Sequence, residues 1–221
     1  MNVDIRKISI NEPILLLGGG SYKEKQIKKY LNLANFIIAV DGGANKLKNI
    51  KPKYIVGDFD SLKNKKIWKE KGVKLIKIKE QDTTDFEKCL YLFNSKLFIC
   101  LGFSGKRLDH FFSVCSSLIK YSEKKIILIN KEDIIFHVPK KFEVDLPTKT
   151  RISFFSFNYK NKIMSKGLKW DLDKADLFFS KSTSISNLNV DRKVVINCSD
   201  RGMLGVLPKK FIKNLVNSFN D

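Results

Sequence analysis

The sequence predicts an α/β fold, in which a doubly wound, mostly parallel sheet domain is followed by a small β-sandwich domain. Three observations support this prediction. Short apolar runs alternate with helix-like segments over roughly the first 130 residues, glycine and aspartate follow most of these runs directly, and strand-like runs succeed one another from about residue 139. Apolar strands that alternate with helices are typical of a parallel sheet with helices on both faces.

In the first region, apolar runs predict strands over residues 14–17, 36–40, 54–56, 73–78, 97–101 and 126–129. More polar segments between them predict helices over residues 22–31, 62–71, 84–93 and 108–121. Ligands of open α/β sheets bind beyond the carboxyl ends of the strands. Because the polar motifs follow those ends, we expect the site at this edge.

The second region changes in pattern. Short runs predict strands over residues 142–146, 151–157, 177–179, 194–198 and 203–207, and a helical pattern returns only over residues 209–219. We therefore expect a catalytic domain over residues 1–132 and a β-rich domain over residues 139–221. A chain of 221 residues is long enough to bury a sizeable core in this arrangement.

Composition points to a cytoplasmic protein. No run approaches the roughly 20 apolar residues of a membrane span, and the first residues lack the apolar segment of a signal peptide. The four cysteines form no C-x-x-C pair and lie in apolar segments, which favours buried free thiols over disulfides or a zinc site; they are Cys89, Cys100, Cys115 and Cys198.

The net charge of +19 has two interpretations. It can reflect a surface for polyanions such as nucleic acid. It can also reflect an A/T-rich coding sequence, because Lys, Ile, Asn and Phe are all abundant and the chain has only five arginines. Arginine dominates base and phosphate recognition. We therefore expect no specific nucleic-acid partner and no membrane partner.

Two acidic motifs carry the most chemical information: residues 57–61 (G-D-F-D-S) and residues 81–86 (Q-D-T-T-D-F). Asp58 and Asp60 would point the same way in an extended segment. Asp82 and Asp85 lie at a helix start, where Asp82 could instead be a structural N-cap. Dense carboxylates repel one another unless a cation lies among them, and Mg²⁺ prefers such oxygen ligands. These four aspartates are the predicted metal-binding and catalytic residues.

Three glycine-containing motifs accompany them: residues 18–21, 41–45 (D-G-G-A-N) and 102–110 (G-F-S-G-K-R-L-D-H). None matches the P-loop pattern, but glycine turns let backbone N–H groups approach phosphate. Asp41 could cap a helix or contact a nucleotide, and Arg107 can bind phosphate through two hydrogen bonds. His110 alone is a weak signal, and His137, in an apolar run, is expected to be structural. The motifs together indicate an enzyme that uses a nucleoside polyphosphate.

Five motifs, in this order, resemble those of the thiamine pyrophosphokinase family. The family patterns G-D-[FL]-D-S, D-x-T-D-[FT] and G-[GK]-R-[LF]-D-[HQ] match residues 57–61, 82–86 and 105–110. Its G-L-K-W-x-L and S-x-S-N patterns match residues 167–172 and 184–187. One feature departs from the family. Some members have a tryptophan in the last strand that stacks on thiamine, whereas residues 202–206 (G-M-L-G-V) contain no aromatic residue.

The resemblance implies an ATP-binding domain, a thiamine-binding β-domain, and a homodimer with thiamine near the subunit interface. It implies Mg²⁺-dependent transfer of a pyrophosphoryl group from ATP to the thiamine hydroxyl, giving thiamine diphosphate and AMP. The implied thiamine-binding residues are Ser184, Ser186 and Asn187. The implied ATP-binding residues are Asp41, Gly42, Gly43, Gln81, Thr84, Gly105, Lys106, Arg107, Asp109 and His110. Two alternatives remain, namely a related Mg²⁺-dependent phosphotransferase with another alcohol acceptor, and a basic nucleic-acid-binding module.

Overall fold

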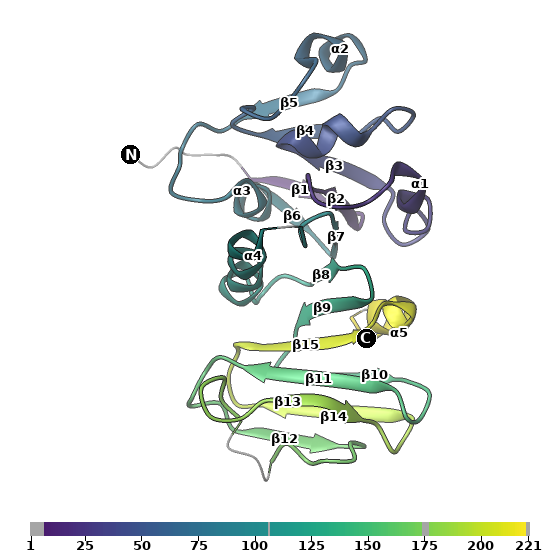
Figure 1. Cartoon of the computed structure of the whole chain (residues 1–221), viewed down its shortest axis with the longest axis vertical. Helices are drawn as coiled ribbons and strands as arrows, with labels where there is room; N and C mark the ends of the chain where they lie inside the picture. Colours follow the sequence, from purple (N-terminus) through teal and green to yellow (C-terminus); the bar gives the residue numbers. More distant parts are fainter. Residues whose placement is uncertain (1–6, 106, 174–176, 220–221) are drawn as a thin grey trace. The chain divides into compact units, whose positions relative to one another are not determined.

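The computed structural model describes residues 7–105, 107–173 and 177–219 (Figure 1). The chain has a mixed α/β fold and divides between Ser117 and Leu118 into two compact units. The predicted mostly parallel, doubly wound sheet holds only in part, because the strands are parallel in the first unit and antiparallel in the second. None of the helices in the described ranges has the length and apolar character needed to cross a membrane.

The first unit is built around five parallel strands in the order β7-β2-β3-β4-β5. Strands β1 and β6 form a separate two-stranded parallel sheet, and neither strand was predicted. The bounds are β1 (Ile8–Ile10), β2 (Ile14–Leu17), β3 (Phe36–Val40), β4 (Tyr54–Gly57), β5 (Lys74–Lys77), β6 (Phe93–Ser95) and β7 (Phe98–Leu101). β2 and β7 are completely buried, as continuous apolar runs in a parallel sheet predict.

Short helices connect these strands: α1 (Glu24–Ile27), the 3₁₀ helix η1 (Asp41–Lys46), α2 (Lys65–Glu70), α3 (Asp85–Leu92) and α4 (Leu108–Lys120). The N-cap of α3 is Thr84, whose hydroxyl accepts a hydrogen bond from the Glu87 N–H (3.3 Å), while the Glu87 carboxylate accepts one from the Thr84 N–H. This capping box starts the helix at Asp85. The alternative prediction that Asp82 is the N-cap is therefore wrong.

The second unit contains two antiparallel sheets, in the orders β13-β11-β15-β9-β8 and β10-β14-β12. The strands are β8 (Ile126–Ile129), β9 (Asp133–His137), β10 (Lys141–Asp145), β11 (Arg151–Ser156), β12 (Ile163–Lys166), β13 (Ser184–Leu188), β14 (Lys193–Cys198) and β15 (Met203–Pro208). The helices η2 (Lys209–Phe211) and α5 (Ile212–Ser218) follow. The predicted strand over residues 177–179 forms only an isolated bridge, between Phe178 and Ser182.

Aromatic rings fill part of the core of the second unit. The ring centroid of Phe136 lies 5.2 Å from that of Phe142 and 6.1 Å from that of Phe219. Phe136 also covers Gly205 so closely that a Cβ atom there would lie 2.5 Å from the ring. Position 205 therefore has no room for a larger side chain, because Phe136 already occupies the space.

Candidate active site

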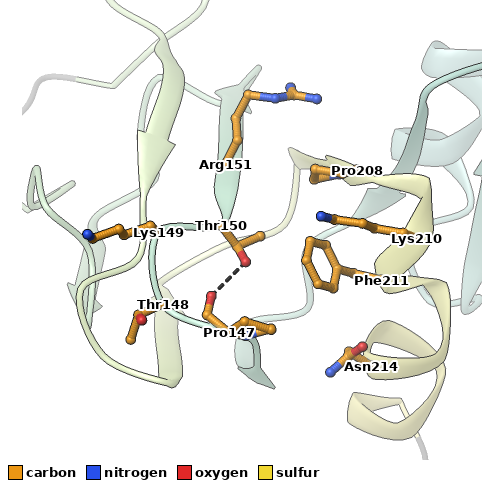
Figure 2. Close-up of a pocket in the computed structure, with 9 residues that line it drawn as sticks. All are labelled: Pro147, Thr148, Lys149, Thr150, Arg151, Pro208, Lys210, Phe211 and Asn214. Carbon is orange, nitrogen blue, oxygen red and sulfur yellow. Dashed lines mark hydrogen bonds between the residues drawn. The ribbon is translucent and has the colours of Figure 1, made fainter.

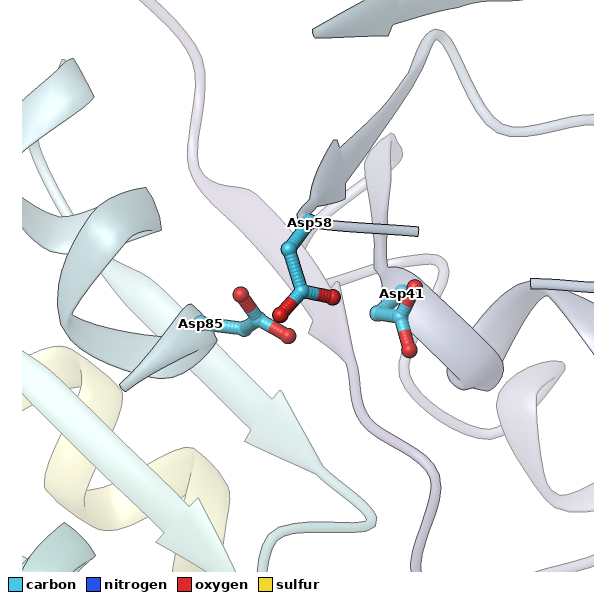
Figure 3. A group of neighbouring side chains, drawn as sticks. All are labelled: Asp41, Asp58 and Asp85. Carbon is cyan, nitrogen blue, oxygen red and sulfur yellow. The ribbon is translucent and has the colours of Figure 1, made fainter. Parts of the chain in front are cut away.

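Three carboxylates converge beyond the carboxyl ends of β3 and β4 (Figure 3). Asp41 begins η1 directly after β3, Asp58 follows β4, and Asp85 is the first residue of α3. One oxygen atom of each lies within 4.8 Å of the others, so the three side chains could hold one cation. We call Asp41, Asp58 and Asp85 the acidic triad.

The members of the acidic triad differ in their surroundings. Burial, together with the charges of Asp85 and Asp60, raises the pKa of Asp41. Its Oδ2 accepts a hydrogen bond from the Ser61 N–H (3.2 Å), but its buried Oδ1 has no partner among the described residues. Asp58 has a lowered pKa because its carboxylate accepts hydrogen bonds from the Asp60 N–H (3.0 Å) and the Gln81 side chain (3.2 Å).

A buried lysine supports the third carboxylate. Lys88, one turn along α3, is 1% exposed, and its Nζ donates to Oδ1 of Asp85 over 3.1 Å. Burial nevertheless raises the pKa of Asp85. When all are ionised, three carboxylates and one ammonium sum to a charge of −2. A single divalent cation would balance this charge, and Mg²⁺ has the matching preference for hard oxygen ligands.

The backbone at the end of β4 is specialised to bring the triad together. Gly57 has a φ of +155°, and a Cβ atom there would lie 2.8 Å from Cβ of Asp41 and 3.2 Å from Oδ2 of Asp85. Phe59 has a φ of +67°. Residues 58–60 are therefore not extended. The prediction that Asp58 and Asp60 point the same way assumed an extended segment, so it loses its basis. Asp60 is exposed, but its charge still raises the pKa of Asp41 and Asp85.

Glycine turns at the same edge bring further backbone close to the triad. The Gly20 N–H donates to the carbonyl of Gly102 (2.7 Å), and Cβ atoms at Gly18 and Gly20 would each lie 2.6 Å from that oxygen. A Cβ at Gly43 would lie 2.3 Å from the carbonyl of Leu17. The ends of β2, β3 and β7 are therefore in close contact, which places the glycine motifs beside the acidic motifs.

The segment at the start of α4 differs from this crowded edge because its polar side chains are exposed. The Arg107 guanidinium donates two hydrogen bonds to the Asp109 carboxylate, at 2.6 Å and 3.2 Å, and this pairing lowers the pKa of Asp109 to about 2. His110 is also exposed. The two-pronged geometry is the one by which arginine binds a phosphate.

The segment of residues 184–187 belongs to strand β13. Asn187 is buried, and its amide donates to the Trp170 carbonyl (2.7 Å) and accepts from the Trp170 N–H (3.2 Å). It also donates to Oγ of Ser184 (3.1 Å). Ser186 has a φ of +57° beside an irregularity in the β11–β13 pairing, and its N–H donates to Oγ of Ser153. Asn187 therefore joins two segments of the second unit.

Comparisons with known proteins identify the family. The profile described as "Thiamin pyrophosphokinase, catalytic domain" matches residues 27–129, and the profile "Thiamin pyrophosphokinase, vitamin B1 binding domain" matches residues 133–204. Thiamin pyrophosphokinase 1 of Caenorhabditis elegans is 30% identical over 189 residues, covering 76% of this chain and 77% of that protein. The chain belongs to the thiamine pyrophosphokinase family. Thiamine pyrophosphokinase 1 of Arabidopsis thaliana is 26% identical over 212 residues, covering 80% of this chain and 79% of that protein.

Solved structures of thiamine pyrophosphokinases share the fold. The enzyme from Candida albicans superposes with a TM-score of 0.74 at 20% identity, covering 90% of each chain. The yeast enzyme superposes with a TM-score of 0.73 at 19% identity, covering 97% of this chain and 94% of that one. At these identities the likeness supports the two-domain fold of the family and does not assign individual residues.

The structure brings together some, but not all, of the predicted metal-binding aspartates. Asp58 and Asp85 belong to the acidic triad, and Asp60 lies within electrostatic range. Asp82 does not join them. It lies exposed on a turn, where its backbone N–H donates a hydrogen bond to the Glu80 carboxylate (2.8 Å). Asp41, predicted as a cap or a nucleotide contact, joins the triad instead. Lys106 lies outside the described residues.

Sequence reasoning missed two supporting residues. Lys88 lies among the buried apolar residues of α3, and a lysine at the third position after an aspartate is a recognisable signal for an internal ion pair. Glu80 accepts hydrogen bonds from the Asp82 and Thr83 N–H groups and from the Tyr91 hydroxyl, and so fixes the turn before α3. Only the folded turn identifies this second role, because Tyr91 lies eleven positions away.

Proposed function

We propose that the chain is a Mg²⁺-dependent thiamine pyrophosphokinase, which transfers a pyrophosphoryl group from ATP to the hydroxyl of thiamine and releases AMP and thiamine diphosphate. The observation that carries the proposal is the acidic triad, located at the ligand-binding edge of a sheet in a chain of this family. The two family profiles meet near residue 130, which supports a catalytic domain over residues 1–132 and a thiamine-binding domain over residues 139–221.

The donor set fits Mg²⁺. Three carboxylate oxygens lie within 4.8 Å of one another, and Oδ1 of Asp41 is buried without a hydrogen-bond partner among the described residues. Asp41, Asp58 and Asp85 would hold the ion, which when bound supplies positive charge that neutralises the phosphate oxygens. Lys88 keeps Asp85 in place, and Gln81 does the same for Asp58.

Positioning and charge compensation are the main demands of phosphoryl chemistry, and the surrounding residues suit them. Backbone N–H groups of the glycine turns, including Gly42, Gly43 and Gly105, can approach the phosphates of ATP. Arg107 would exchange the Asp109 carboxylate for a phosphate, which requires little rearrangement because the pair is exposed. Asp60, exposed beside the triad, is our candidate to accept the hydroxyl proton of thiamine. For Asp82, the sequence motif is the only support for a role in metal binding or catalysis.

For thiamine, Ser184 and Ser186 are the proposed contacts, whereas the bonds of Asn187 support a positioning role for this residue. A homodimer is also part of the proposal. Exposed aromatic residues near this segment support it, because the Phe157 and Phe179 rings stack with centroids 4.7 Å apart, and Phe179 is 51% exposed. Light scattering after size-exclusion chromatography, over a range of protein concentrations, tests the dimer. A cytosolic location is supported by four free cysteines, three of them buried.

One assay tests the reaction. The protein is incubated with ATP, Mg²⁺ and thiamine, and the products are separated by chromatography. We expect AMP and thiamine diphosphate in equal amounts, and no product when EDTA replaces Mg²⁺. Release of ADP in step with thiamine consumption would contradict pyrophosphoryl transfer. Turnover of a different alcohol at a higher kcat/KM than thiamine would favour the related phosphotransferase instead.

A further inference from the structure

A pocket of about 580 Å³ lies entirely within the second unit, between the β10–β11 connection and the segment that leads from β15 into α5 (Figure 2). We propose that it binds a small phosphorylated ligand with a flat ring, of the nucleoside monophosphate class. This proposal does not depend on the proposed catalytic function. The lining residues are Pro147, Thr148, Lys149, Thr150, Arg151, Pro208, Lys210, Phe211 and Asn214.

The first wall of the pocket is held by a buried asparagine. Asn189 is 1% exposed, and its Oδ1 accepts a hydrogen bond from the Thr150 N–H (2.7 Å) while its Nδ2 donates to the Leu146 carbonyl (3.2 Å). Within the wall, the Thr150 hydroxyl donates to the Pro147 carbonyl (2.6 Å), as the dashed line in Figure 2 marks. These bonds fix the wall before any ligand arrives.

The second wall is anchored by α5. Ile212 and Leu215 are buried in the core, and the Asn214 side chain donates to the Asp145 carbonyl (2.8 Å). The Lys209 N–H donates to the Glu132 carbonyl (2.9 Å), which fixes the start of η2. With both walls held by buried contacts, the pocket is preformed, and binding would not have to order a loop.

The charge of the pocket favours an anion. Three of the nine lining residues are cationic, namely Lys149, Arg151 and Lys210, and none of the nine is acidic. The Lys149 side chain points away from Phe211 and Lys210 (Figure 2), so Lys210 and Arg151 are the cations that concern a ligand. The Lys210 ammonium lies 5.0 Å from the centroid of the Phe211 ring and extends toward the side of Thr150 (Figure 2). Arg151 lies at the rim, where Asp133 holds its guanidinium in place and partly offsets its charge. An ammonium and an oriented guanidinium are the usual protein ligands for a phosphate group.

The apolar part of the lining favours a flat ring on the same ligand. The Phe211 ring faces the pocket between Lys210 and Asn214, opposite Pro147 (Figure 2). Nucleic-acid bases stack on aromatic side chains irrespective of their sequence, and adjacent cations add to that attraction. The pocket has a volume of about 580 Å³ and is open to solvent, so a small molecule bound there would remain partly exposed.

One wall of this pocket lies beyond the residues that the family comparison covers, and the other wall lies within them. The thiamine-binding profile ends at residue 204, whereas one wall is made of residues between Pro208 and Asn214. None of the nine lining residues belongs to the acidic triad, the glycine turns or the segment of residues 184–187. A ligand bound here would therefore occupy a second site of the enzyme.

The test is a titration of the ¹⁵N-labelled full-length protein with AMP, followed by the shifts of backbone amides. We expect AMP to move the signals of residues 148–151 and 209–214, which report on this pocket independently of any AMP bound near the acidic triad. Ribose 5-phosphate is the comparison ligand, because it keeps the sugar and the phosphate but lacks the flat base. We expect it to shift the same signals with an affinity weaker by about fivefold or more. Absence of shifts in both segments at millimolar AMP would overturn the proposal.

Two variants and a matched control sharpen the test. Lys210→Glu should weaken the affinity for AMP, measured from these amide shifts, by about tenfold or more. The matched control is Lys213→Glu, which makes the same charge change on an exposed residue of α5 that does not line the pocket and should weaken it less. Phe211→Leu should remove the advantage of AMP over ribose 5-phosphate. Equal weakening by Lys210→Glu and Lys213→Glu would contradict a built site, because it would mean that general electrostatics account for binding. Equal affinities of AMP and ribose 5-phosphate would contradict the ring component.

Discussion

The acidic triad of the first unit and the segment of residues 184–187 of the second unit both belong to short polar motifs of the sequence, yet their polar atoms are used in opposite ways. In the triad, Oδ1 of Asp41 is buried without a hydrogen-bond partner among the described residues. In the second unit, the amide of Asn187 is buried to a similar degree, but it bonds to both the N–H and the carbonyl of Trp170. The motif alone cannot distinguish these two cases.

This difference points to a ligand-binding role for the Asp41 carboxylate and to a structural role for the Asn187 amide. A buried polar atom without a partner costs about 1–3 kcal/mol, and more for a charged group, so native proteins rarely contain one. Three neighbouring carboxylates add mutual repulsion to that cost. Such an arrangement is typical of a site whose missing partner is a cation. A fully bonded amide such as Asn187 instead stabilises its surroundings, and it affects a ligand only through the residues that it positions.

The largest expected effect comes from Asp41→Asn. The amide can still accept the hydrogen bond of the Ser61 N–H, but one charge of the proposed metal site is lost, so kcat should fall by roughly 10²-fold or more. The thermal stability measured in EDTA should stay the same or rise, because one carboxylate of a repelling group has been removed. Initial rates with ATP, Mg²⁺ and thiamine, together with thermal unfolding, provide both measurements.

Asp82→Asn is the matched control, since Asp82 is an exposed carboxylate of the second acidic motif outside the triad. We expect its kcat to change by less than about threefold. Similar losses in Asp41→Asn and Asp82→Asn would mean that the triad is not the functional group of carboxylates.

Sequence patterns predicted the central strands well because those strands are continuous apolar runs. The predicted bounds of β2, β3 and β8 agree with the structure. The strands that were missed include the short or polar strands β1, β6, β12 and β13, and also the apolar strand β9. Their pairing depends on partners far away in the sequence, such as Ile8 with Phe93, and a local period cannot report such a pairing.

The site was predictable to the extent that its residues follow strand ends. Asp58 and Asp85 were found in this way, and Asp41 was noticed but interpreted as a cap or a nucleotide contact. Its place in the triad depends on the parallel neighbours β3 and β4, which bring the two strand ends together. Asp82 was predicted as a metal-binding residue at a helix start, because spacing cannot reveal that the capping box begins the helix three residues later. The left-handed backbone of Phe59 is likewise not encoded by any glycine or asparagine.

A second prediction tests the positioning role of Asn187. Asn187→Ala would leave the N–H and the carbonyl of Trp170 without their partner, and should lower the free energy of unfolding by about 3 kcal/mol. Ser186→Ala removes only an exposed hydroxyl and should cost less than about 0.5 kcal/mol, while raising the KM for thiamine if this side chain contacts the substrate. Chemical denaturation measures the stability, and steady-state kinetics measure KM. An Asn187→Ala protein of full stability with only a raised KM would show that Asn187 is a ligand contact.

A third prediction uses buried groups of the two units whose contributions to stability change with pH in opposite directions. Burial lowers the pKa of His137 to about 4 from an ordinary value of 6.5, and its Nε2 accepts a hydrogen bond from the Gly202 N–H. The unfolded chain therefore takes up this proton first, and the stability from neutral His137 is lost as pH falls from about 6.5 through 4. For Asp41 and Asp85 the sign is reversed: their raised pKa gives a contribution that is complete below about 4 and lost as pH rises.

The measurement compares wild type with His137→Gln, which stays neutral at every pH. Between pH 7 and pH 5, wild type should lose about 2 kcal/mol of unfolding free energy more than the variant loses. Parallel stability curves for the two proteins would mean that His137 does not titrate as its burial requires.

The smallest expected effect concerns salt and returns to the contrast between the two regions. ATP is an anion that must reach carboxylates, so its capture depends on nearby cations such as the exposed Arg107, whereas thiamine itself carries a positive charge. Raising the ionic strength from about 50 mM to 300 mM shortens the range of these interactions, and the KM for ATP should rise about threefold while that for thiamine stays nearly constant.

Arg107→Gln should flatten this salt dependence, and Arg192→Gln, which changes an exposed arginine of the second unit, should leave it unchanged. If both variants flattened it equally, the attraction would arise from the net charge of +19 as a whole and not from the segment at the start of α4. A KM for thiamine that rises as steeply as that for ATP would mean that both substrates enter through the same charged surface.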